Sequence, residues 1–188
     1  MNNELQRYGR NKDTVINHAY IEGGEYRRKF DRLSDDKNLN RLIYQKAKEM
    51  LKHRSGTLFE DMYWIDIDTT EVVASETTQE KEQRIIYSKN TKSIITQNNN
   101  LLTLHTHPNS MPPSVSDFNS AFSNNYRICI VCCHDGKIFI YQSNRKISKI
   151  LHSFTIAKYK KMGYNEYESQ LLSLCDFQNN GDIVFKEV

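Results

Sequence analysis

The stretch from Leu101 to Cys133, LLTLHTHPNSMPPSVSDFNSAFSNNYRICIVCC, decides the fold. It begins with the apolar run LLTLHTH and ends with a second apolar run, YRICIVCC, and each run predicts a strand. Between them lie a proline-rich loop and a segment that we expect to form a short helix starting near Ser114. A strand, a helix and a strand in succession favour a fold that mixes both element types.

The flanking sequence extends this pattern in both directions. Apolar residues recur at spacings of three and four from Leu39 to Leu51, which predicts a helix with one face on a core. KNTKSIITQNNN predicts a short helix, and two further helical patterns follow Ser153, the second over roughly residues 165–175. We expect a sheet of about six strands, formed by MYWIDID, TEVVAS, QRIIYS, LLTLHTH, YRICIVCC and KIFIYQS. The order predicts a mixed α/β domain whose helices cover a central sheet.

The length of 188 residues fits one ordinary domain. Residues 1–36 are polar, aperiodic and broken by Gly23-Gly24, so we expect an irregular or partly helical N-terminal arm before a main domain over residues 37–188. No run approaches the roughly 18 apolar residues of a membrane span, and MNNELQRYGRNKD lacks a signal-peptide core. We therefore expect a cytoplasmic protein with no membrane partner, and the sequence does not indicate its oligomeric state.

The charge of the chain bears on its binding partners, and its cysteines bear on a structural metal site. The formal net charge is only +3, and the basic residues near Arg27 alternate with acidic ones, which argues against a nucleic-acid partner. Cys129 and Cys132 form a CxxC with no second pair, so we expect reduced, partly buried thiols and not a structural zinc knuckle.

His105 and His107 are the residues that point to chemistry. Residues i and i+2 of a strand project to the same face, so the two imidazoles lie side by side. Pro108 then ends the strand, and the loop returns so that Asp117, in the first turn of the next helix, can face the pair. Two imidazoles and a carboxylate suit Zn²⁺, which keeps a fourth position for water in catalytic sites.

Two further residues complete a hydrolytic site. Glu60, between the first long helix and the first strand, is the best-placed carboxylate to move a proton. The hydroxyl of Ser114 could donate to the oxyanion of a tetrahedral intermediate. There is an alternative for each residue: Ser114-x-x-Asp117 also resembles a helix capping box, and other carboxylates compete with Glu60, namely Asp61, Asp66, Asp68, Glu71 and Glu76.

These residues resemble the motif of the JAMM metalloproteases, also called MPN+ or JAB-domain proteins. That motif is an upstream Glu, then His-x-His-Pro, a short loop and Ser-x-x-Asp, and the matching residues are Glu60, His105, His107, Pro108, Ser114 and Asp117. The resemblance covers roughly residues 37–142. It implies that His105, His107 and Asp117 bind zinc, that Glu60 is the general base and acid, and that Ser114 stabilises the transition state. It also implies a curved, mostly antiparallel β-sheet flanked by helices, with the layering of cytidine deaminases.

The chain departs from the eukaryotic deubiquitinating members of this family. Its loop between Pro108 and Ser114 holds five residues, one fewer than theirs, and the context resembles the bacterial and phage-associated branch. The insertions that hold ubiquitin are not recognisable, so the resemblance implies a protein or peptide substrate and nothing narrower. We expect a zinc-dependent peptidase or isopeptidase. Two alternatives stay open: a catalytically silent scaffold on the same fold, and a nucleic-acid-associated protein of the RadC-type branch, which the modest charge disfavours.

Overall fold

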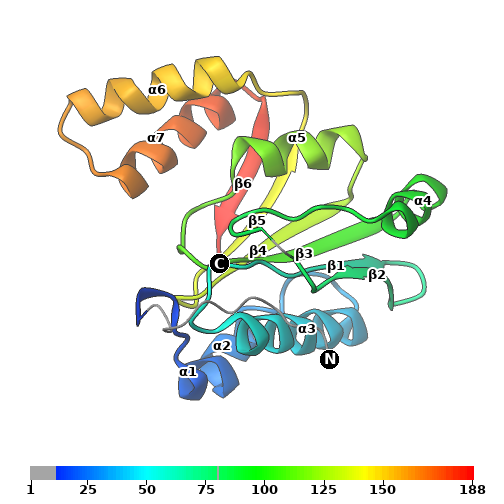
Figure 1. Ribbon diagram of the computed structural model, residues 1–188. Coiled ribbons are helices and arrows are strands. Elements are labelled where there is room, and N and C mark those ends of the chain that lie inside the picture. Colours follow the sequence, from blue (N-terminus) through cyan, green and yellow to red (C-terminus); the bar gives the residue numbers. More distant parts are fainter. Residues whose placement is uncertain (1–11, 80) are drawn as a thin grey trace.

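An open six-stranded sheet forms the centre of the computed structural model, which describes residues 12–79 and 81–188 (Figure 1). Its order is β2-β1-β3-β4-β5-β6; β3 pairs with β4 in parallel, and the other neighbours are antiparallel. The expected mixed α/β class with a mostly antiparallel sheet is therefore confirmed. The strands are β1 (Met62–Asp66), β2 (Glu71–Glu76), β3 (Leu101–His107), β4 (Ile128–Cys133), β5 (Ile138–Ser143) and β6 (Ile183–Glu187).

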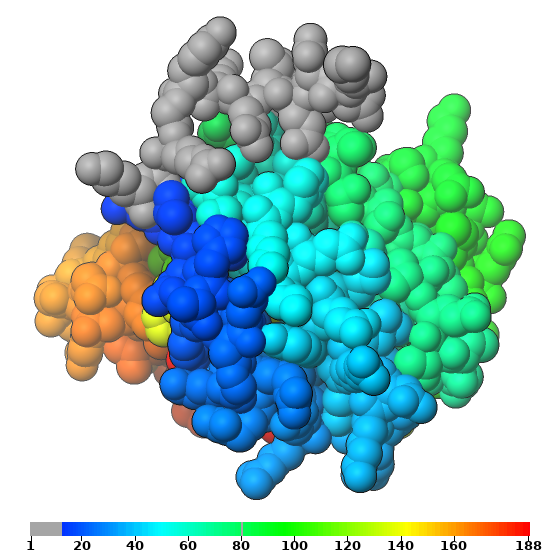
Figure 2. All heavy atoms as spheres, turned by 90° about the horizontal axis from the view of Figure 1, so that it is seen from below, coloured from blue at the N-terminus to red at the C-terminus, as the bar shows by residue number. Residues whose placement is uncertain are grey.

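Helices cover both faces of this sheet. In Figure 1, α1 to α3 lie below it and α5 lies above it, and the view from below in Figure 2 shows α1 to α3 spread over that face. The helices are α1 (His18–Glu22), α2 (Gly24–Arg28), α3 (Lys37–Arg54), α4 (Lys89–Gln97), α5 (Val115–Ser123), α6 (Lys149–Lys161) and α7 (Glu166–Asn179), and a 3-10 turn (Lys12–Thr14) precedes them.

Side chains point alternately to the two faces of the sheet, so the core consists of two clusters, one on each face. Trp64 and Val131 pack in the cluster on the α5 face, whereas Ile65 and Ile130 pack in the cluster on the α3 face. Every residue of β3 is buried, since this central strand has a neighbour on each side and a helix layer on each face. The helix α5 carries the chain across from β3 to the parallel β4, as a parallel pair requires.

The expected strand over QRIIYS is wrong. Residues 83–88 belong to no strand, and the sixth strand is β6, which the sequence patterns do not predict. The side chain of Gln79 replaces a strand partner: the Ile86 amide donates to Gln79 Oε1 at 2.7 Å, and Gln79 Nε2 donates to the Ile86 carbonyl at 3.4 Å. An apolar run can thus be held extended without joining the sheet.

Helix boundaries follow the caps. The α4 helix and α5, which starts after Ser114, lie where expected. By contrast, α6 begins at Lys149, before the expected position past Ser153, because the Ser148 side chain accepts from the Leu151 amide and caps it. The α7 helix continues to Asn179, beyond the expected Cys175. No described helix has both the length and the apolarity that crossing a membrane requires.

The described part of the expected arm, residues 12–36, contains α1 and α2. Ile21, Tyr26 and Phe30 are buried in the same cluster as α3, so this segment shares the core of the main domain. Residues 1–11 of the arm lie outside the described residues.

The cysteines of β4 are free and buried. Cys129 belongs to the cluster on the α5 face and Cys132 to the cluster on the α3 face. The CxxC pair therefore cannot converge on one metal ion, in agreement with the expectation of buried thiols.

Candidate metal centre

His105 and His107 lie at the end of β3, and their Nε2 atoms are 3.1 Å apart. Asp117, in the first turn of α5, brings Oδ1 to 3.6 Å from His105 Nε2 and Oδ2 to 3.5 Å from His107 Nε2. One donor atom from each residue lies within 4.8 Å of the others. The structure thus brings the three expected ligands together, in the arrangement that a divalent metal ion needs.

A hydrogen bond orients the His107 ring toward this point. His107 Nδ1 lies 2.8 Å from the carbonyl oxygen of Met111, which can only accept. In the neutral ring Nδ1 therefore carries the proton, and the lone pair of Nε2 faces His105 and Asp117. The proline-rich loop thus supplies a second-layer contact of the kind that metal-ligating histidines make.

Ser114 and Asp117 also form the capping box that the sequence analysis kept as an alternative. Ser114 Oγ accepts from the Asp117 amide at 3.3 Å, and the Ser114 amide donates to Asp117 Oδ2 at 2.6 Å. The two interpretations are compatible, because Asp117 Oδ1 still faces His105. The capping box therefore holds the Asp117 carboxylate next to the two imidazoles.

Glu60 lines the same cavity as the three expected ligands and Ser114. Its neighbour Asp61 ties it to β3 from both directions: the Asp61 amide donates to Thr106 Oγ1, and the Thr106 amide donates to the Asp61 carbonyl, each at 3.1 Å. Thr106 lies between the two histidines, so this pair of bonds sets Glu60 beside them. Burial raises the pKa of Glu60 to about 7, with His107 lowering it and Asp117 raising it less strongly.

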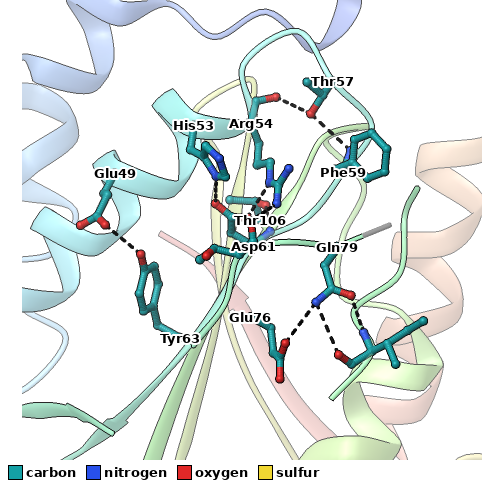
Figure 3. A network of polar contacts seen from close by, with 12 residues as sticks. Glu49, His53, Arg54, Thr57, Phe59, Asp61, Tyr63, Glu76, Gln79 and Thr106 are labelled. Carbon is teal, nitrogen blue, oxygen red and sulfur yellow. Dashed lines mark hydrogen bonds and ion pairs between the residues drawn. The ribbon is translucent and has the colours of Figure 1, made fainter. Parts of the chain in front are cut away.

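None of the competing carboxylates lines this cavity. Asp61 is fully buried on the other side of the backbone, where Arg54 Nε lies 2.5 Å from Oδ1 and His53 Nδ1 lies 2.7 Å from Oδ2 (Figure 3). Glu76 accepts from the Ser88 amide and from Thr91 Oγ1. Glu60 is therefore the carboxylate that remains available to the centre.

Electrostatics separate the two imidazoles. Burial lowers the pKa of His105 to about 4. Burial also opposes the charge on His107, but the hydrogen bond and charge of Asp117 outweigh it and raise the pKa of His107 to about 9. Burial likewise opposes ionisation of Asp117, yet the two histidines hold its pKa well below the usual range. These shifts favour a charged His107 beside the ionised Asp117 and a neutral His105 at pH 7.

The cavity around the centre has a volume of about 800 Å³. Its walls include residues that the sequence analysis did not single out as site residues, among them Arg84, Tyr87, Lys92, Tyr141 and Lys149. Tyr141 stands edge-on to His105, with ring centroids 6.3 Å apart. No local motif marks these residues, because they come from the segment 83–88, α4, β5 and α6, which only the tertiary fold brings to one cavity.

Comparison of the chain with protein-family models, with curated proteins and with solved structures finds no match. Two imidazole nitrogens and a carboxylate converge, a second carboxylate lies beside them with a raised pKa, and a hydroxyl stands at the start of α5.

Proposed function

We propose that the protein is a zinc-dependent peptidase or isopeptidase of the JAMM type, acting in the cytoplasm. The observation that carries the proposal is the convergence of His105, His107 and Asp117 in a cavity that also contains Glu60, which stays outside the ligand cluster. The free, buried thiols of β4 fit a reducing compartment.

His105, His107 and Asp117 would hold the metal ion. A Zn²⁺ ion in such a site supplies Lewis-acid chemistry, activating water and polarising the carbonyl of the bond to be cleaved. Glu60 takes the proton from the attacking water and delivers it to the leaving amine. Its burial suits this exchange, because a pKa near 7 lets the carboxylate both accept and return a proton. Protein or peptide is therefore the proposed substrate.

Ser114 contributes a hydrogen-bond donor. Its Oγ accepts from the Asp117 amide, which leaves its own O–H proton free to donate to a developing oxyanion. The same donor set of two imidazoles and one carboxylate also occurs in non-haem iron sites. The adjacent Glu60 and Ser114 favour hydrolysis, since a proton carrier and an oxyanion donor are what amide cleavage requires.

The test combines metal analysis with a variant that spares the ligands. Elemental mass spectrometry of the purified chain should find about one zinc per chain, and a His105→Ala, His107→Ala variant that is still folded by circular dichroism should have none. Glu60→Gln should keep the zinc and lower kcat on a fluorogenic peptide or lysine isopeptide by about 10³-fold. The exposed Glu71→Gln is the control and should leave kcat unchanged.

Two results would count against the proposal. A wild-type chain that takes up no zinc even when zinc is supplied would remove the peptidase mechanism and favour a scaffold. Unchanged turnover in Glu60→Gln would remove Glu60 from its role.

A further inference from the structure

Three cationic side chains lie on the wall of the cavity, away from the expected ligands. They are Arg84 in the extended segment 83–88, Lys92 in α4 and Lys149 at the start of α6, and all three are exposed. None of them has an ion-pair or hydrogen-bonding side-chain partner among the residues that the structure describes. Some lysines elsewhere on the molecule do have such partners, as in the pairs Lys46–Glu49, Lys137–Asp135 and Lys160–Glu166.

Apart from the candidate centre itself, no described residue gives the cavity an acidic side chain that would neutralise these cations. Its only acidic side chains among the described residues are Glu60 and Asp117, and both belong to the centre. Asp117 faces the two histidines at 3.5 and 3.6 Å, and a bound divalent ion would add positive charge there. The other polar residues of the wall are neutral: Gln83, Asn109, Ser116 and Gln170 are examples. A concave surface of one sign attracts ligands of the opposite sign more strongly than a flat one.

The cations occupy two separate walls. The wall formed by residues 83–88 and α4 is held by the Gln79 clamp on Ile86 and by the carboxylate of Glu76, which binds the Ser88 amide and Thr91 Oγ1. Lys149 belongs to the opposite wall, where α6 and α7 contribute Lys149 and Gln170. In Figure 1, α4 and α6 lie on opposite sides of α5, whose first turn carries Asp117. The three cations therefore reach the cavity from elements on either side of α5.

We infer that the cavity selects peptide segments with acidic side chains on both sides of the bond to be cleaved. Arg84 and Lys92 would bind carboxylates on one side, and Lys149 would bind one on the other. The inference rests on the proposed function for the existence of a cleaved bond. The charge preference itself is a property of binding and can be measured without cleavage.

The test uses the full chain with Glu60→Gln, supplied with zinc, and fluorescence anisotropy of labelled peptides. Three peptides of equal length carry Asp and Glu, Lys, or only uncharged residues on both sides of a central Gly. The acidic peptide should bind about 10-fold more tightly than the uncharged one at low ionic strength, and added salt should remove the difference. The Lys peptide should bind weakest.

A charge-matched pair of variants, each also carrying Glu60→Gln, locates the effect. The first triple variant combines Arg84→Gln, Lys92→Gln and Lys149→Gln, and it should abolish the preference for the acidic peptide. The second triple variant removes three exposed cations elsewhere, through Arg41→Gln, Lys37→Gln and Lys161→Gln, and it should retain the preference. The first variant keeps all metal ligands, so binding of a carboxylate to the metal ion alone would survive in it and would overturn the inference. Equal affinity for the three peptides, or equal loss in both variants, would also overturn it.

Failure of the inference and failure of the proposed function give different results. An acidic preference that depends on Arg84, Lys92 and Lys149 supports the inference even where the wild-type chain cleaves nothing, and that result removes only the peptidase. Cleavage of all three peptides with equal kcat/KM by the wild-type chain supports the peptidase and removes the inference.

Discussion

His107 is the residue through which the candidate metal centre should respond to pH. The charge and hydrogen bond of Asp117 overcome the effect of burial and raise the pKa of His107 to about 9, whereas burial keeps His105 neutral above about pH 4. A metal ion must therefore displace one proton from His107 at any pH below about 9. The same carboxylate that completes the ligand set thus makes protons compete with the metal.

Zinc affinity should accordingly rise with pH. Between pH 6 and 8 the apparent affinity is expected to increase about 10-fold per pH unit, since one proton leaves His107 on binding. Competition with a chromophoric chelator measures it. Glu60→Gln is the control, because Glu60 also titrates near pH 7 and the variant leaves His107 as the group that responds. An affinity that does not change over this range would contradict the assignment.

The sequence predicts the residues of the centre better than their surroundings. A spacing of two on a strand suffices to place His105 and His107 together, and Nε2 atoms 3.1 Å apart bear this out. The sequence favours Glu60 but leaves Asp61 as a competitor, and only the structure shows that Arg54 pairs with the Asp61 carboxylate. The three cationic residues of the cavity wall, Arg84, Lys92 and Lys149, cannot be predicted at all, since they come from segments that only the tertiary fold brings together.

At the scale of the elements, a buried ion pair fastens α3 to β1 and β3. Arg54, the last residue of α3, and Asp61 are each about 1% exposed, and Arg54 also donates to the Thr77 carbonyl beyond β2. The backbone of Asp61 in turn bonds Thr106 twice, since its amide donates to Thr106 Oγ1 and its carbonyl accepts from the Thr106 amide (Figure 3). One contact therefore joins a helix to the strand that carries the histidines.

Removing one partner of this pair should be costly. Arg54→Met is expected to lower the free energy of unfolding by about 3–5 kcal/mol, because it leaves the Asp61 carboxylate buried without its cation. The double variant Arg54→Met, Asp61→Leu should recover part of this loss. Urea denaturation of both variants measures the difference, with His53→Ala, whose side chain is 40% exposed, as a control expected to lose about 1 kcal/mol or less. Equal stability of wild type and Arg54→Met would show that the pair contributes nothing.

Element prediction fails where a side chain replaces backbone pairing. QRIIYS has the composition of a strand, yet Gln79 satisfies the Ile86 amide and carbonyl and keeps this segment outside the sheet. Helices α3, α4 and α5 are predicted well, because their apolar periodicity and polar N-caps are local features. Pairing between strands depends on residues that are distant in the chain, so local sequence patterns do not predict it.

Over the whole molecule, packing is uneven. The α3 helix buries eight side chains, including Ile43 and Met50, whereas α6 has no buried residue and exposes Ile150 and Phe154 at about 70%. Helix α6 packs chiefly against α7, on the side of the molecule away from α3 (Figure 1). Its local stability should be low, because few apolar contacts oppose its opening.

Amide hydrogen exchange followed by mass spectrometry should show this difference. Peptides from α6 should exchange well before peptides from α3 at pH 7, although both are regular helices. The buried strand β3 serves as the slow reference. Protection of α6 equal to that of α3 would contradict the expectation.

The position of Glu60 in the chain has a consequence for folding. The three ligands lie within residues 105–117, a short stretch whose ends meet without long-range pairing, while Glu60 joins them only once β1 has paired with β3. The proposed metal ligands therefore lie close together in the chain, whereas the proposed proton carrier comes from a distant segment. In the proposed peptidase, hydrolysis thus requires a longer-range part of the fold than metal binding does.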